Sequence, residues 1–97
     1  MTDFLFHSEA QEEYESARAW YRERSPRAAA RFEAEMERVL KLIGENPESF
    51  PHYDDDHSYV LMHRFPYCVV YQVQSAAIFI VAIAHGRRAP GYWRGRN

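Results

Sequence analysis

The chain has 97 residues, a formal net charge of −2 and 46% hydrophobic residues, which suffices for one core and excludes a largely disordered chain or a second domain. Its single cysteine, Cys68, excludes an internal disulfide, and the spacing of Cys and His residues matches no zinc site. No apolar run approaches the roughly 20 residues of a membrane-spanning helix and the N-terminus lacks a signal-peptide pattern, so we expect a cytoplasmic protein without a membrane partner.

The first segment predicts a short strand followed by a helix. Residues 3–6, DFLF, are apolar and aromatic, as in a strand. Ser8 is a candidate helix cap, because acidic residues follow it in the first turn, where the helix dipole favours them. Apolar residues then recur every three to four positions, so we expect this helix to run to about Arg24.

A second helix start follows immediately. Ser25 offers a capping hydroxyl, and Pro26 suits the first helical position. Gly44 and Pro47 mark the expected end of this helix. With only a tight turn between them, the two helices should form an antiparallel hairpin. The apolar stripe of the second helix consists of Ala29, Phe32, Met36, Val39, Leu40 and Ile43.

Residues 46–57 contain two prolines, an acidic triplet and no apolar period, which predicts a surface loop. Two imidazoles and three carboxylates lie close together at its end, but their spacing matches no zinc or calcium loop. We therefore expect neither a metal nor a cofactor. The residues concerned are His52, Asp54, Asp55, Asp56 and His57.

From residue 58 the pattern changes to alternating β-branched and aromatic residues, which predicts strands over 58–65, 67–74 and 76–85. Short connections between them predict an antiparallel meander. The last strand is apolar on both faces, so it should be flanked on each edge, with residues 3–6 as its second neighbour. In the middle strand Tyr67, Val69, Tyr71 and Val73 form the expected core face. The predicted fold is α+β, in the order β-α-α-β-β-β, with the helical hairpin on one face of a four-stranded, mainly antiparallel sheet.

Charge is distributed unevenly along the chain. Residues 1–57 contain fourteen acidic and seven basic residues, a charge of −7, whereas residues 58–97 contain five arginines and no acid, a charge of +5. A positive surface for a negatively charged partner explains this asymmetry, although sheet structure is poor in acids in any case. Aromatic rings between the arginines suit stacking on nucleobases, or else they fold back and close the core.

Other side chains offer little chemistry. No serine lies in a nucleophile-elbow motif, and Cys68 lies in the middle of a predicted strand, where cysteine is usually an inert small hydrophobe. His85 lies on an otherwise apolar strand without an obvious chemical partner, so we expect a structural role for it. The sequence therefore points to no catalytic nucleophile.

Four motifs in order resemble the RelE/ParE toxin superfamily, specifically its ParE-like branch of plasmid stabilisation proteins. They span about Phe6 to Trp93 and read HSEAQEEYESARAWY, SPRAAARFEAEMERVLKLIGENP, RFPYCVVYQV and VAIAHGRRAPGYW. The resemblance implies one toxin domain over residues 1–97, with 89–97 as a basic tail, from a bacterial type II toxin-antitoxin module. It also implies a cognate antitoxin that wraps the toxin, for which the candidate contacts are Trp20, Tyr21, Phe32 and Met36.

Two activities compete within this superfamily. ParE-like members inhibit DNA gyrase, whereas RelE-like members cleave messenger RNA on the ribosome with lysine, arginine and tyrosine side chains. Arg64, Arg88 and Tyr92 would be the ribonuclease residues here, but the accompanying lysines are absent, and arginine is a poor base. We therefore expect a gyrase inhibitor; the alternatives are the endonuclease and a non-toxic partner-binding member. The expected target-binding surface comprises Arg64, Arg87, Arg88, Tyr92, Trp93 and Arg94.

Overall fold

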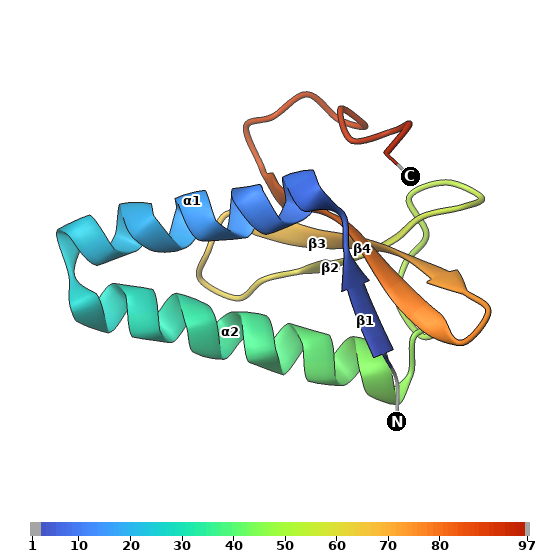
Figure 1. Cartoon of the computed structure of the whole chain (residues 1–97), viewed down its shortest axis with the longest axis horizontal. Helices are drawn as coiled ribbons and strands as arrows, with labels where there is room; N and C mark the ends of the chain where they lie inside the picture. The colour runs from blue at the N-terminus through green and yellow to red at the C-terminus, as the bar shows by residue number, and fades with distance from the viewer. Residues whose placement is uncertain (1–2, 97) are drawn as a thin grey trace.

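Two helices pack on one face of a four-stranded sheet (Figure 1). The computed structural model describes residues 3–96. No helix in this range is long and apolar enough to span a bilayer. The order β-α-α-β-β-β and the α+β class are as predicted. The elements are β1 (Asp3–Phe6), α1 (Ser8–Arg24), α2 (Pro26–Glu45), β2 (Ser58–Leu61), β3 (Tyr67–Gln74) and β4 (Ala77–His85).

The strand order is β1-β4-β3-β2, with β1 parallel to β4 and the other pairs antiparallel. The prediction that residues 3–6 flank the last strand is thus confirmed. The pairing of β1 with β4 stops where Phe6 lies opposite Ile80. Because the chain then turns into α1, β4 has no strand neighbour on this side from residue 81 to residue 85. Its backbone groups there need other hydrogen-bond partners.

The helix caps differ in part from expectation. The N-cap of α1 is His7, whose Nδ1 accepts the N–H of Glu9 at 3.1 Å. Ser8 was the wrong candidate, because it is already the first helical residue and a cap needs extended backbone. The second cap is confirmed: Ser25 Oγ accepts the N–H of Ala28 at 3.3 Å, and α2 starts at the proline that follows.

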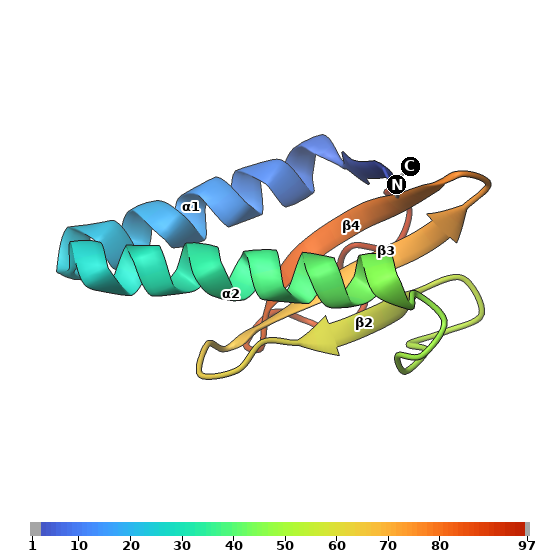
Figure 2. The ribbon, with the colours of Figure 1, turned by 90° about the horizontal axis from the view of Figure 1, so that it is seen from below.

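Both faces of the sheet are covered. The inner face carries the predicted core residues Tyr67, Val69 and Tyr71 against the helices, whereas Val73 is 53% exposed. That part of the prediction was wrong because the β3–β4 hairpin extends past the end of α2 (Figure 2). The outer face holds a second buried cluster, which the sequence did not predict. It consists of Val70, Val81, Ala82, Ala84 and Trp93.

The loop between β2 and β3 is attached to α2 through Glu35. The Oε2 atom of Glu35 accepts the backbone N–H of His63 at 2.5 Å, and both carboxylate oxygens accept from Arg38 at 2.8 and 2.7 Å. These hydrogen bonds, that from Arg38 first, hold the pKa of Glu35 below its usual value despite partial burial. Strand 58–65 was predicted too long, because β2 ends at Leu61 and Arg64 adopts a positive φ of 66° that a strand does not allow.

We expect Glu35→Ala to lower the free energy of unfolding by about 1–3 kcal/mol at neutral pH, because the His63 N–H and Arg38 lose their acceptor. Since the folded pKa is lowered, this contribution is present above the unfolded-state pKa of Glu35. It is lost as the pH falls through the folded value. Urea unfolding as a function of pH measures both effects.

Glu37→Ala removes the same charge from an exposed position of α2 and serves as the control. An equal loss of stability in the two variants would contradict the role of Glu35 in holding the loop.

Candidate functional site

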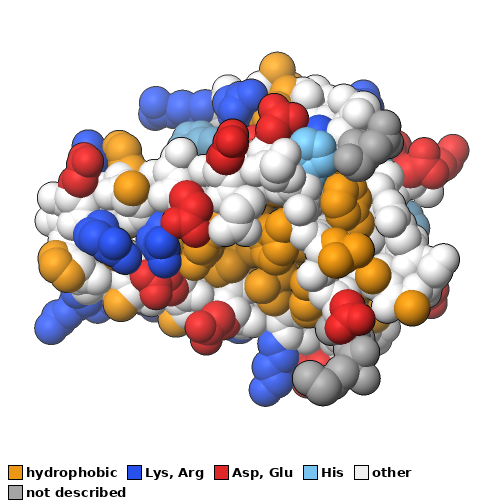
Figure 3. All heavy atoms as spheres, in the orientation of Figure 1, with side chains coloured by type: hydrophobic (Ala, Val, Ile, Leu, Met, Phe, Trp, Pro, Cys, Tyr) orange, Lys and Arg blue, Asp and Glu red, His pale blue; other side chains and the backbone are white. Residues whose placement is uncertain are grey.

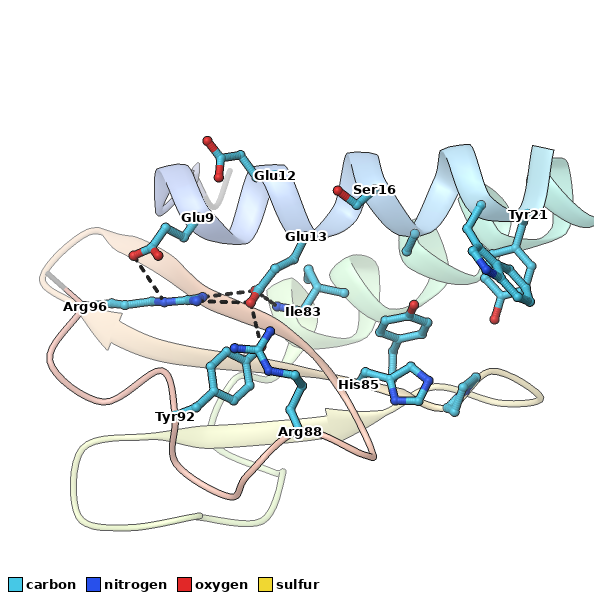
Figure 4. Close-up of a pocket in the computed structure, with 14 residues that line it drawn as sticks. Glu9, Glu12, Glu13, Ser16, Tyr21, Ile83, His85, Arg88, Tyr92 and Arg96 are labelled. Carbon is cyan, nitrogen blue, oxygen red and sulfur yellow. Dashed lines mark hydrogen bonds and ion pairs between the residues drawn. The ribbon is translucent and has the colours of Figure 1, made fainter. Parts of the chain in front are cut away.

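A groove of about 650 Å³ runs between α1 and the segment that follows β4 (Figure 4). One wall is the face of α1 that carries Glu9, Glu13 and Trp20. The other wall is the unpaired edge of β4 together with the C-terminal segment. The lining residues from this second wall include Ile83, His85, Arg88, Tyr92 and Arg96.

Glu13 is the centre of a hydrogen-bond network at one end of this groove. Its Oε1 accepts the backbone N–H of Ile83 at 3.0 Å, and its Oε2 accepts the hydroxyl of Tyr92 at 2.6 Å. Both guanidinium NH₂ groups of Arg96 donate to the same carboxylate at 3.0 Å (Figure 4). The C-terminal segment is therefore attached to α1 by a bidentate ion pair, the geometry that gives arginine–carboxylate pairs their strength.

Arg96 also completes the edge of β4. Its Nη1 donates to the carbonyl oxygen of Val81 at 3.1 Å, and its Nε lies 3.6 Å from Glu9. Only 10% of its side chain is exposed, against 15% for Glu13. Burial opposes the charge of Arg96, but the hydrogen bonds and the charge of Glu13 outweigh it and raise the pKa of Arg96. These two residues thus satisfy two edge groups of β4 that lack a strand partner, the Ile83 N–H and the Val81 carbonyl.

Sequence reasoning missed this network. Glu13 is one of several acidic residues near the start of α1, and Arg96 fits a basic tail, so neither residue has a local signal that singles it out. The two residues are 83 positions apart in the chain. Only the termination of β1 before the end of β4 brings them together.

Tyr92 is held in a protonated state. Burial, followed by the hydrogen bond to Glu13, raises the pKa of its hydroxyl well above the usual value. The Arg88 guanidinium carbon lies 3.8 Å from the centre of the Tyr92 ring, a cation–π contact. A hydroxyl that already donates to a carboxylate and resists ionisation is poorly suited to accept a proton.

The contacts of His85 fit the structural role that we expect for it from the sequence. Its Nδ1 accepts the backbone N–H of Arg87 at 3.0 Å, so the neutral ring carries its proton on Nε2. The ring lies edge-on to Tyr67, with 5.0 Å between centroids. With its acceptor nitrogen occupied, this imidazole is not available as a general base.

Trp93 was predicted as part of the target-binding surface, but its side chain is buried. It is 2% exposed and lies in the outer-face cluster, with ring centroids 4.9 Å from Tyr53 and 4.6 Å from His57. It was expected either to close the core or to line the basic surface, and the structure shows the first. The reason is that the outer face of the sheet has no helix to cover it, and this indole fills that place.

The acidic loop helps to hold Trp93 in position. Asp54 Oδ1 accepts from His57 Nδ1 at 2.9 Å and from the His57 backbone N–H at 2.8 Å, and Asp54 Oδ2 lies 3.3 Å from Arg94 Nε. Desolvation opposes ionisation, but hydrogen bonds from His57 and from the backbone N–H groups of Asp56 and His57 lower the pKa of Asp54 to about 2. These carboxylate contacts are internal to the protein.

The predicted arginines fall into two groups. Arg87, Arg88 and Arg94 are exposed in the segment after β4. Arg64 is also exposed, but it lines a separate hollow beside α2. The residues named for a ribonuclease, Arg64, Arg88 and Tyr92, therefore do not line one common cavity among those described.

The candidate antitoxin contacts also divide. Trp20 is 50% exposed and lines the groove with the half-buried Tyr21. Phe32 and Met36 are 0% and 4% exposed, because both belong to the core between α2 and the sheet. A partner cannot reach these two side chains in the folded protein, so that part of the prediction was wrong.

We expect Glu13→Gln to lower the free energy of unfolding by about 2–4 kcal/mol, because it leaves the buried Arg96 with only the exposed Glu9 as a countercharge. Trypsin should also cut faster after Arg88 and Arg94 as the C-terminal segment detaches. Urea unfolding and limited proteolysis measure the two effects. Glu12→Gln, at the exposed neighbouring position, should leave both unchanged. Wild-type proteolysis of Glu13→Gln would contradict the attachment.

Comparison with known proteins agrees with this architecture. The chain superposes on a solved structure described as "Chromosomal ParDE TA system from P. aeruginosa", with a TM-score of 0.73, 15% identity, and coverage of 88% of this chain and 96% of that one. At this identity the likeness shows the fold alone. None of the curated proteins compared with the chain matches it significantly in sequence. Residues 4–90 match the family described as "ParE toxin of type II toxin-antitoxin system, parDE". The match covers most of the sequence, and the chain therefore belongs to the ParE toxin family.

Proposed function

We propose that this ParE-family protein acts in the bacterial cytoplasm by binding and inhibiting DNA gyrase, and that a cognate antitoxin neutralises it. The contact surface in this proposal is formed by Arg87, Arg88 and Arg94, which are exposed around the end of β4. Exposed guanidinium groups favour a partner of opposite charge, either an acidic protein surface or the phosphates of gyrase-bound DNA.

The observation that carries a binding role, as opposed to a catalytic one, is the engagement of Tyr92 with Glu13. A ribonuclease that activates a 2′-hydroxyl needs a group that takes the proton. Tyr92 donates to Glu13 at 2.6 Å, and His85 uses its acceptor nitrogen for the backbone of Arg87. Arginine does not serve as a base at neutral pH. The surface thus offers charge and shape without a proton acceptor among the residues named for that chemistry.

The groove beside α1 is the proposed antitoxin site. Trp20 supplies a large exposed ring, with the Arg24 guanidinium carbon 3.5 Å from its centre and the Tyr21 ring edge-on at 5.0 Å. Such rings are typical anchors for partner side chains. Figure 3 also shows hydrophobic side chains exposed between α1 and α2, an apolar surface that suits an amphipathic antitoxin segment.

The gyrase proposal predicts that Arg87→Gln/Arg88→Gln/Arg94→Gln needs at least about tenfold more protein to inhibit supercoiling by purified gyrase. The physical reason is the loss of three positive charges at the contact surface. Tyr92→Phe should inhibit as well as the wild type, because the hydroxyl does no chemistry. Arg22→Gln/Arg24→Gln/Lys41→Gln removes the same charge from the helices and is the matched control.

The opposite pattern would reject this proposal. It would consist of intact supercoiling together with cleavage of ribosome-bound messenger RNA that Tyr92→Phe abolishes. That result would establish the ribonuclease alternative.

The antitoxin proposal predicts that Trp20→Ala weakens binding of the antitoxin by about tenfold or more. The antitoxin is expected to be the product of the neighbouring reading frame, and calorimetry of the two purified proteins measures its affinity. Leu61→Ala is the control, because Leu61 is 65% exposed on β2, at the opposite edge of the sheet. Equal affinities of Trp20→Ala and the wild type would exclude Trp20 from the interface.

A further inference from the structure

A second basic surface lies on α2 and the β2–β3 loop, away from the groove described above. It is a hollow of about 670 Å³, and four arginines and one histidine line it together with a single acidic residue, Glu35. The basic residues are Arg27, Arg31, Arg38, Arg64 and His63. This local concentration of positive charge occurs on a chain whose net charge is −2.

The only carboxylate in the hollow is already engaged. Glu35 accepts two hydrogen bonds from Arg38 and one from the His63 backbone. It therefore neutralises Arg38 and leaves Arg27, Arg31 and Arg64 without an acidic partner among residues 3–96. Three like charges that gather without a counterion repel one another, and a bound anion would relieve this repulsion.

The backbone presents these three arginines together. Arg27 and Arg31 are four residues apart on α2 and so project from the same face of the helix. Arg64 is brought to the same hollow because Glu35 holds the backbone of the preceding residue, His63.

Arg64 also has an unfavourable backbone conformation. Its φ of 66° lies in the left-handed region, which favours glycine and costs other residues of order 1 kcal/mol or more. The fold tolerates an arginine where glycine would fit better. A strained backbone conformation at a non-glycine residue is typical of a functional position.

We propose that this hollow binds an acidic segment of a protein partner, whose carboxylates pair with Arg27, Arg31 and Arg64. Arginine forks match carboxylates in bidentate geometry, and the apolar lining, Ala28, Ala34 and Phe65, suits small apolar side chains between the acidic ones.

Nucleic acid fits this surface less well. The one aromatic ring in the hollow, Phe65, already packs edge-to-face against Tyr21 and Phe32 and is half-buried, so no free ring is available to stack on a base. The inference does not depend on gyrase inhibition, because it concerns a different face of the protein.

The test uses the whole protein and a fluorescein-labelled peptide of about 12 residues in which Glu and Asp alternate with Ala and Leu. Fluorescence anisotropy should show binding that weakens as salt is raised, and a matched peptide with Gln and Asn in place of the acids should not bind. Arg27→Gln/Arg31→Gln/Arg64→Gln should lose at least about tenfold in affinity. Arg22→Gln/Lys41→Gln removes two positive charges from exposed positions elsewhere on the helices and should stay within about twofold.

Arg64→Gly separates binding from folding. It relieves the backbone strain and should therefore unfold at no lower temperature than the wild type, while it binds the acidic peptide more weakly. The proposal is overturned if the peptide binds the triple variant as well as the wild type. It is also overturned if a DNA duplex of about 20 base pairs binds this hollow and the peptide does not. If the wild-type protein binds the acidic peptide but does not inhibit gyrase, that result contradicts only the proposed function.

Discussion

The early end of β1 is the constraint on which the C-terminal half of this structure depends. β4 continues five residues beyond Ile80, the last residue paired with β1, and its edge groups there would be unsatisfied inside the protein. An unpaired buried backbone group costs about as much as a lost hydrogen bond or more. Glu13 and Arg96 meet this need by accepting from the Ile83 N–H and donating to the Val81 carbonyl. The side chains of an N-terminal helix and of the last described residue thus replace a missing strand.

This arrangement decides how the basic C-terminal segment can act. With Arg96 drawn inward to Glu13, residues 86–96 lie across the outer face of the sheet, and Trp93 packs in the outer-face cluster. Tyr92 follows the same path, and its hydroxyl donates a hydrogen bond to the same carboxylate. Arg87, Arg88 and Arg94 remain exposed. The segment therefore combines a structural side, which completes the sheet, with a charged side, which suits a binding role in a ParE-family toxin.

A similar arrangement of a carboxylate and an arginine is found between α2 and the β2–β3 loop. Glu35 attaches the β2–β3 loop to α2, much as Glu13 attaches the C-terminal segment to α1. Each carboxylate accepts one backbone N–H and two hydrogen bonds from one arginine. Arg38 and Arg96, which are paired in this way, are therefore not available to bind a partner. Other exposed arginines form two separate surfaces, which consist of Arg87, Arg88 and Arg94 after β4 and of Arg27, Arg31 and Arg64 beside α2.

The sequence by itself determined the element order, the antiparallel helical hairpin, the place of residues 3–6 beside the last strand and most of the inner core, because these follow from apolar periodicity, caps and turns that are local in the chain. It did not determine which charged side chains are buried and which are exposed. Arg96 and Arg94 look alike in the sequence, yet one is buried against Glu13 and the other is exposed. Tertiary structure alone decided this, since the choice rests on a strand edge left open by β1 and on partners up to 83 positions apart. A local sequence pattern carries no information about contacts between residues that far apart in the chain.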